Sequence, residues 1–146
     1  MPSASEGKPS SAGLAVFVSN RQAIAVDEPE LVAVAERTLA GEGRVQGELS
    51  VSLVTQEEMT DLHVTYTGEQ GPTDVLSFPM DEDGLLGDVV ICPAEAAARN
   101  NPDLASELRL LVAHGVLHLL GHDHEEGKER RVMWAKQAVY SKVTRA

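Results

Sequence analysis

The sequence predicts a single α+β domain in which several helices pack on a small β-sheet. Short runs with strand-like alternation are interspersed with segments whose apolar residues recur at helical spacing. The chain of 146 residues is 42% hydrophobic, so it is long enough to bury one core and too short for a second full domain. Because aromatic residues make up only 3% of the chain, we expect Val, Leu and Ala to fill that core.

The first half of the chain predicts two strands that alternate with two helices. The strands have short apolar or alternating patterns, and the helices have apolar side chains three or four positions apart. In chain order these segments are a strand at 14–18, a helix at 28–39, a strand at 49–53 and a helix at 56–66. Gly41 and Gly43 end the first helix, and Thr55 is suited to cap the second.

The second half predicts a hairpin followed by two helices. Residues 74–78 and 87–92 are β-rich and flank an acidic turn that ends in Asp83-Gly84. The next helix is expected to begin at Asn101-Pro102-Asp103, with asparagine as the cap and proline at the first helical position. In the last helix we expect an apolar stripe to face the core, made of Val132, Ala135, Val139 and Val143.

The stretch HGVLHLLGHDH, residues 114–124, holds four of the five histidines of the chain. His114 and His118 are four positions apart on a predicted helix, so their rings project from one face and can grip one metal ion. Gly121 favours a left-handed turn that brings the following residues back toward the helix. The pattern HxxxHxxGxxH selects His124 as the third ligand and leaves His122 as a bystander.

A lone buried histidine is more often a hydrogen-bonded core residue than a ligand, but three histidines with a correctly placed glycine favour a metal site. Neutral imidazole suits zinc, although nickel, copper and iron accept the same ligand. Three protein ligands leave a fourth position for water, which is the arrangement of a catalytic zinc. Because zinc lowers the pKa of that water, the pattern predicts hydrolysis of a phosphoryl or carbonyl group.

The spacing is that of metzincin proteases, but Gly115 stands where those enzymes carry the glutamate that acts as general base. A protease would therefore lack its catalyst. Asp88 and Asp123 are the candidate catalytic carboxylates, and each has a structural alternative. Asp88 could cap a strand or bind backbone, and Asp123 could orient a ligand histidine.

Three motifs in order, GPTDVLSFP, LLGDVVICP and HGVLHLLGHDH, resemble the YbeY family of endoribonucleases and rRNA maturation factors over residues 14–140. The resemblance implies a zincin-like fold, in which a small mixed sheet packs around a central metal-binding helix. It implies one zinc ion on His114, His118 and His124. It also implies a single-strand-specific endoribonuclease that acts in 16S rRNA 3′-end maturation and ribosome quality control, with the small ribosomal subunit and its assembly factors as partners.

Two positions depart from the family pattern. His122 stands where the family usually has tyrosine, and Thr67 follows Tyr66 where the family commonly has arginine. The scissile phosphate must then be held by another cation, for which Arg109 and the C-terminal basic residues are candidates, or cleavage is weak.

The net charge of −11 argues against unspecific nucleic-acid binding, and we expect no binding to DNA. Six of the twelve basic residues nevertheless fall in the last nineteen positions: Lys128, Arg130, Arg131, Lys136, Lys142 and Arg145. This segment could follow the backbone of single-stranded RNA. The alternative is a ribosome-assembly factor that binds the small subunit and uses zinc mainly to hold its fold.

The remaining features concern compartment and termini. Cys92 has no partner for an internal disulfide, and no secretory signal or apolar run of about 20 residues is present, so we expect a cytoplasmic protein without a membrane span. Residues 1–13, rich in Ser, Pro, Ala and Gly, are expected to form a flexible tail. Residues 14–146 would form the metal-dependent hydrolase domain.

Overall fold

A computed structural model describes residues 13–99, 103–122 and 127–143. Within them the elements are β1 (Leu14–Asn20), α1 (Glu28–Gly41), β2 (Gly47–Leu53), α2 (Gln56–Thr67), β3 (Val75–Glu82), β4 (Leu85–Ile91), α3 (Pro93–Arg99), α4 (Leu104–Leu119) and α5 (Gly127–Ser141). The expected tail lies outside the described residues except for Gly13, and so do Asp123, His124 and Arg145. No described helix combines the length and apolar character that a bilayer crossing requires.

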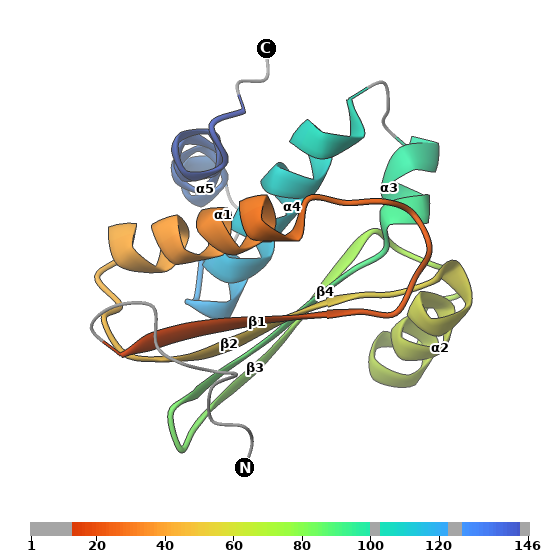
Figure 1. Ribbon diagram of the computed structural model, residues 1–146, viewed down its shortest axis with the longest axis horizontal. Helices are drawn as coiled ribbons and strands as arrows, with labels where there is room; N and C mark the ends of the chain where they lie inside the picture. Colours follow the sequence, from red (N-terminus) through yellow and green to blue (C-terminus); the bar gives the residue numbers. More distant parts are fainter. Residues whose placement is uncertain (1–12, 100–102, 123–126, 144–146) are drawn as a thin grey trace.

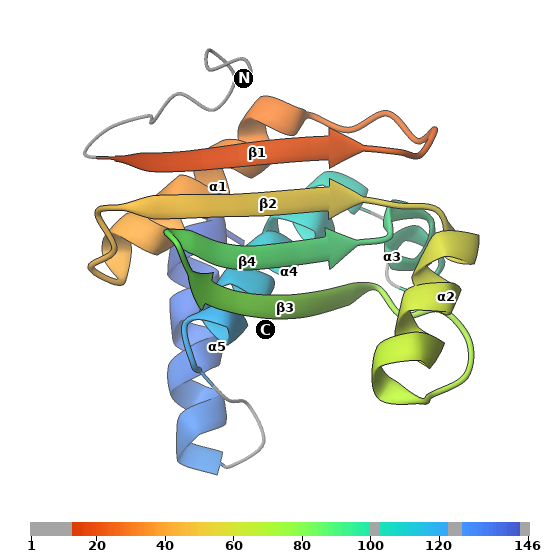
Figure 2. The same cartoon turned by 90° about the horizontal axis from the view of Figure 1, so that it is seen from below.

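The four strands form one mixed sheet in the order β1-β2-β4-β3 (Figure 2). β1, β2 and β4 run parallel, and β3 pairs antiparallel with β4. The predicted hairpin is confirmed, with strands that extend further toward the turn than expected. Asp83 and Gly84 both have positive φ, at 54° and 79°, which matches the twist of a two-residue hairpin turn.

Helices cover the two faces of the sheet unequally (Figure 1). α1 and α4 pack on one face, where Val89 and Ile91 of β4 join the main core. α2 packs on the other face, where Val90 joins a smaller cluster with Met59 of the helix. α4 contacts α1, α3, α5 and two strands, so it is the central helix. The predicted α+β domain with a small mixed sheet is confirmed, while the zincin-like architecture stays a prediction.

Side chains cap the N-termini of α2 and α4. Thr55 caps α2 as predicted, since its hydroxyl accepts a hydrogen bond from the Glu58 N–H at 3.1 Å. The expected start of α4 is wrong by two residues, because the N-cap is Asp103 rather than Asn101. The Asp103 carboxylate accepts both the N–H of Ser106, at 3.2 Å, and its hydroxyl, at 2.6 Å. These two bonds explain why the helix begins at the aspartate.

The predicted core stripe of α5 is wrong. Val132 and Val139 are 42% and 68% exposed. The residues that α5 buries are Met133, Gln137 and Ser141, which are four positions apart. A stripe at this spacing lies on one helix face, but two of its three members are polar, so hydrophobic periodicity does not reveal it.

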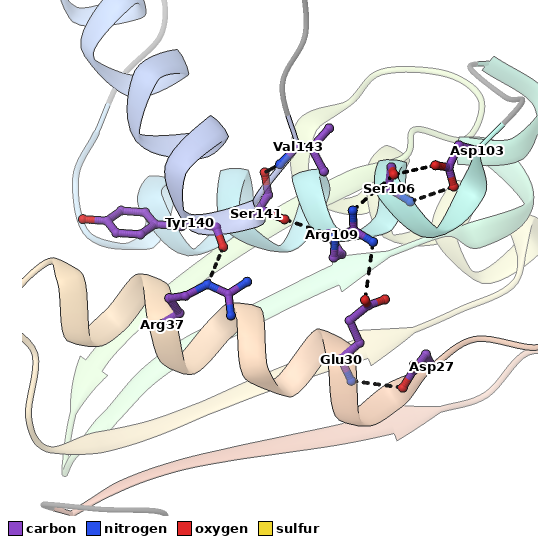
Figure 3. Close-up of polar contacts among 9 residues, drawn as sticks. All are labelled: Asp27, Glu30, Arg37, Asp103, Ser106, Arg109, Tyr140, Ser141 and Val143. Carbon is purple, nitrogen blue, oxygen red and sulfur yellow. Dashed lines mark hydrogen bonds and ion pairs between the residues drawn. The ribbon is translucent and has the colours of Figure 1, made fainter.

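The C-terminal end of α5 is held by arginines from the two helices beneath it (Figure 3). Arg37 of α1 donates to the carbonyl of Tyr140 at 2.8 Å, and Arg109 of α4 donates to that of Ser141 at 3.1 Å. Carbonyls in the last turn have no partner within a helix, and the cations also oppose the negative end of the helix dipole. Arg109 further contacts Glu30 at 3.4 Å, so its guanidinium is already used to hold the helices together.

Candidate metal centre

Two of the predicted metal ligands lie side by side on α4. The ring centroids of His114 and His118 are 4.9 Å apart, and the ring planes meet at 67°. Both side chains are half-buried. This arrangement confirms that the two imidazoles share one helix face one turn apart, which is the geometry in which both can bind one ion.

The His114 ring is oriented by a side chain from α5 that the sequence analysis missed. Nδ1 of His114 lies 2.7 Å from Oε1 of Gln137, and Gln137 is only 7% exposed. An amide oxygen accepts hydrogen bonds, so Nδ1 carries the proton and Nε2 keeps its lone pair. A hydrogen-bond acceptor on one ring nitrogen fixes the tautomer in which the other nitrogen can bind metal. The signal in the sequence was Gln137 itself, a polar residue at four-residue spacing between Met133 and Ser141.

The turn after α4 has the conformation that the sequence predicts. Gly121 has φ of +100°, in the left-handed region that glycine adopts readily. Its N–H donates to the carbonyl of His118 at 3.0 Å, and the N–H of His122 donates to that of Leu117 at 3.0 Å. This pair of bonds is a Schellman motif, which ends the helix and redirects the chain directly after the second histidine.

The third predicted ligand, His124, and the candidate base Asp123 lie outside the described residues. Within residues 13–99, 103–122 and 127–143, no group of three or more His, Cys, Asp or Glu side chains comes together as a metal site. The described part of the chain thus supplies two imidazoles of the proposed set, and the role of His124 stays a prediction.

His122 is engaged in a separate cluster around Glu42, which lies at the end of α1. Nε2 of His122 donates to Glu42 at 2.8 Å, and Glu42 also accepts bonds from Lys136 at 2.9 Å and the Tyr140 hydroxyl at 2.6 Å. Burial opposes the charge of Glu42, but the bonds from Tyr140, Lys136 and His122 outweigh it and lower the pKa to about 2. Burial and this carboxylate raise the pKa of Tyr140 to about 12.

This cluster changes the expectation for two residues. His122 is bound to the carboxylate of Glu42 at the end of α1, and its role as a bystander to the metal stays a prediction. Lys136 belongs to the basic segment that could follow the RNA backbone, but its ammonium group is paired with Glu42. Both residues therefore connect the turn after α4 and helix α5 to α1.

Gly115 explains why the protease glutamate is missing. A Cβ at this position would lie 2.5 Å from Cγ1 of Val89 and 3.3 Å from Oγ of Ser77. The Ser77 hydroxyl donates to the carbonyl of Gly115 at 3.0 Å, so the helix backbone rests directly on β3 and β4. Only glycine fits at this approach, and no side chain could act as a base from this position.

The structure does not bring Asp88 together with the histidines. Side chains alternate between the two faces of a strand, and Val89 faces α4 whereas Val90 faces α2. Asp88 shares the face of Val90, where its carboxylate accepts a hydrogen bond from Ser52 at 3.1 Å. The expectation that Asp88 is a general base at the metal is therefore corrected, because the sheet separates it from α4.

Asp88 lies instead beside a cavity of about 260 Å³ on the α2 face, which is also lined by Arg21, Glu58 and Tyr66. Burial raises the pKa of Asp88, while the Ser52 hydrogen bond and the charge of Arg21 act in the opposite direction. Thr67, the position where the family commonly has arginine, ends α2, and its hydroxyl donates to the carbonyl of His63 at 2.6 Å.

The fold and the site define the class of this protein. It is a small α+β protein in which a histidine-bearing helix packs on a mixed sheet and a second helix holds one of the histidines. The sequence profile of the family described as "Endoribonuclease YbeY" matches residues 17–144. The chain therefore belongs to the YbeY family, as its three motifs indicated.

Relatives agree with this assignment, and a solved structure has a similar fold. The endoribonuclease YbeY of Frankia casuarinae is 46% identical over 144 residues, which cover 86% of this chain and 72% of that protein. The endoribonuclease YbeY of Thermobifida fusca is 45% identical over 140 residues, which cover 85% and 90%. The solution structure of TM1509 from Thermotoga maritima is similar to this fold with a TM-score of 0.59 and 30% identity, covering 88% of this chain and 87% of that one.

Proposed function

We propose that this protein is a zinc-dependent, single-strand-specific endoribonuclease that acts in the cytoplasm in 16S rRNA 3′-end maturation and ribosome quality control. The observation that carries the proposal is the pair His114 and His118 on α4, with Gln137 holding the first ring. Membership of a family whose relatives are named endoribonucleases supports RNA as the substrate.

The described residues fit a zinc ion. Two neutral imidazoles on one helix face are ligands that zinc prefers. Because Nδ1 of His114 donates to Gln137, its Nε2 keeps a lone pair that can bind the ion. We propose His124 as the third ligand, delivered by the turn that begins at Gly121. When bound, zinc supplies a Lewis acid that polarises a phosphodiester oxygen and makes water more acidic.

Residues around the site hold α4 in place, and one neighbouring carboxylate is a candidate proton acceptor. Gly115 and Ser77 keep the α4 backbone against the sheet, and the histidines project from the helix beside this contact. Asp123, next to the proposed third ligand, is the remaining candidate from the sequence to accept a proton or to orient that ligand. Water or the 2′-hydroxyl of RNA can attack phosphorus, and only attack by the 2′-hydroxyl leaves a 2′,3′-cyclic phosphate.

The test is incubation of zinc-loaded protein with a single-stranded fragment from the 3′ end of the 16S rRNA precursor, beside the same sequence in a duplex. We expect cleavage of the single strand, loss of cleavage at least 100-fold in His118→Ala, and retention in His122→Tyr, which keeps the proposed ligand set. Analysis of the product ends identifies the nucleophile. Equal cleavage by the wild type and by His118→Ala would contradict a metal-dependent enzyme.

The cleavage assay and two further measurements distinguish the alternative. A ribosome-assembly factor with a structural zinc would bind the small subunit and unfold when zinc is removed, yet the intact protein would cleave no RNA. Circular dichroism with and without a chelator, together with sedimentation with small subunits, measures these properties.

A further inference from the structure

The carboxylate of Glu42, the C-cap residue of α1, binds donors from the two elements that flank the histidine pair. Its side chain is only 11% exposed. His122 donates to Oε1 at 2.8 Å, Tyr140 donates to Oε2 at 2.6 Å, and the ammonium group of Lys136 bridges both oxygens at 3.1 and 2.9 Å. Because an ionised carboxylate only accepts hydrogen bonds, one side chain of α1 holds all three donors.

The donors from α5 lie on either side of the residue that orients the first histidine. Lys136 directly precedes Gln137, and Tyr140 follows it by three positions on the same helix. Gln137 accepts the hydrogen bond from Nδ1 of His114. A movement of α5 away from α1 would therefore also move Gln137 relative to the His114 ring.

The donor from the turn lies just beyond the second histidine. His118 is in the last turn of α4, and Gly121 redirects the chain after it. His122 is the next residue, and its bond to Glu42 holds the chain in the direction in which it leaves the turn. The proposed third ligand, His124, follows two positions later in the sequence. The same carboxylate is thus connected to both ends of the proposed ligand set.

The end of α1 is shaped to bring Glu42 to these donors. Helices α1, α4 and α5 contact one another in all three pairs (Figure 1). Gly41 directly precedes Glu42, and a Cβ at this position would clash with the ring of Tyr140. The N–H of Glu42 donates to the carbonyls of Thr38 and Leu39 at 3.0 and 3.1 Å, which holds the residue at the end of the helix. The glycine therefore lets the Tyr140 ring approach closely enough for its hydroxyl to reach the carboxylate.

We propose that Glu42 is a positioning residue for the zinc site, which holds the turn after α4 through His122 and helix α5 through Lys136 and Tyr140. The proposal rests on the proposed function and deepens it, since it assigns control of zinc affinity to a residue that does not contact the ion. Without these bonds, the turn would have to be ordered when zinc binds. Fixing the backbone of about one residue corresponds to roughly a 5- to 30-fold change in affinity.

A cluster of this kind could instead act only on the stability of the fold, and Glu30 provides the comparison. Glu30 is also a carboxylate of α1 that binds another helix, because it pairs with Arg109 of α4 at 3.4 Å. It lies twelve positions before Glu42, which is about three helical turns away. Loss of the Glu30 carboxylate should therefore affect the packing of α1 without reaching the turn that carries His122.

The experiment measures the zinc dissociation constant of the full chain by competition with a chromophoric chelator, and circular dichroism verifies that each zinc-free variant is folded. Glu42→Met removes the acceptor and keeps a side chain of similar length, so zinc binding should weaken at least 5-fold. Glu42→Gln keeps an oxygen that can accept from His122 and should stay within about 3-fold of the wild type. Glu30→Gln is the matched control and should stay within about 2-fold.

A pair of substitutions at His122 tests the connection through the turn. His122→Phe removes the donor and should weaken zinc binding about 5-fold or more, whereas His122→Tyr supplies a hydroxyl donor and should stay within about 3-fold of the wild type. The two variants differ by one oxygen atom, so a general loss of packing would affect both alike. His122→Phe added to Glu42→Met should weaken binding little further, because both remove the same hydrogen bond.

Two results would overturn the positioning role. One is a zinc affinity in Glu42→Met that equals that of the wild type or of Glu30→Gln. The other is an equal loss of affinity in His122→Phe and His122→Tyr, which would show that the imidazole itself is needed, as it would be if His122 were a ligand.

Failure of this inference is distinguishable from failure of the proposed function. Zinc-dependent RNA cleavage by the wild type, with unchanged zinc affinity in Glu42→Met, would refute the positioning role and leave the enzyme. Weaker zinc binding in Glu42→Met and His122→Phe, without RNA cleavage by the wild type, would support the positioning role and refute the enzyme. A wild type that binds no zinc would refute both.

Discussion

Helices α4 and α5 lie against each other but are held in place by different forces. α4 is packed by an apolar stripe that includes Leu108, Val112 and Leu117, and it lies at the centre of the molecule. α5 buries Met133 together with two polar residues, and hydrogen bonds and ion pairs attach it to α1 and α4. The helix that carries the histidines is therefore fixed by hydrophobic packing, and the helix that orients one of them is fixed by directional contacts.

The two kinds of contact have different consequences for the stability of the fold and for the positioning of a helix. Burial of apolar side chains contributes most of the folding free energy but specifies rotation of a helix only coarsely. A hydrogen bond contributes about 1 kcal/mol net, yet it is satisfied only over a narrow range of distance and angle. Substitutions in the core face of α4 should consequently act mainly on the free energy of unfolding, and those in α5 mainly on the affinity of the proposed zinc site.

The largest effect is expected in the core face of α4. Leu117 is fully buried, so Leu117→Ala should lower the free energy of unfolding by about 2–5 kcal/mol through lost burial and a cavity. Val139→Ala in α5 is the control and should change it by less than about 0.5 kcal/mol, because the side chain is exposed. Urea unfolding monitored by circular dichroism measures both values. Similar values for the two substitutions would mean that the two helices are packed alike.

An intermediate effect is expected at Gln137. Gln137→Leu removes the acceptor for Nδ1 of His114, and loss of such a partner typically weakens metal binding 10- to 100-fold. Gln137→Glu keeps an acceptor and should preserve zinc affinity to within a few-fold. Competition with a chromophoric chelator gives the dissociation constants. If Gln137→Leu binds zinc as tightly as the parent, the residue only fills space between the helices.

The smallest effect is expected from pH at Glu42. The pKa of Glu42 is lowered from 4.5 to about 2 in the folded protein, so its contribution to stability is present above about pH 4.5 and is lost as the pH falls toward 2. Lys136 is 36% exposed, and solvent screening limits this contribution to on the order of 1 kcal/mol.

Urea unfolding of the wild type and of Glu42→Gln at pH 7, 4 and 3 tests this expectation. The difference between the two proteins should shrink as the pH falls, and zinc loss at acid pH is common to both and cancels. A difference that is the same at pH 7 and pH 3 would show that the carboxylate does not stabilise the fold through its charge.

The same contrast explains how much the sequence could predict. The strands, the hairpin and α4 follow from local apolar patterns, and the Gly121 turn follows from the conformational freedom of glycine. The stripe of α5 did not, because Gln137 and Ser141 are polar and their burial depends on partners in other elements. Bonds such as His114 to Gln137 and His122 to Glu42 join residues 23 and 80 positions apart, which no local pattern encodes.

Asp88 shows a different limit of prediction from the sequence. Its alternation with Val89 was visible in the sequence, and it places the two side chains on opposite faces of the strand. The sequence did not show which face the histidine helix would cover, because both Val89 and Val90 are apolar and both faces carry helices. When helices cover both faces of a sheet, the sequence shows which strand residues are candidates for a site. It does not show which helix each of them faces.

The close approach at Gly115 limits how this scaffold could change its chemistry. The histidine spacing is shared with proteases that need a glutamate at this point, yet a glutamate here would have to displace the Val89 side chain and the Ser77 contact before it could reach a substrate. A single substitution would disrupt packing rather than add a base. A change to protease chemistry would need a smaller side chain on the strand together with the glutamate on the helix. The space that one side chain occupies therefore keeps a glutamate base out of this site.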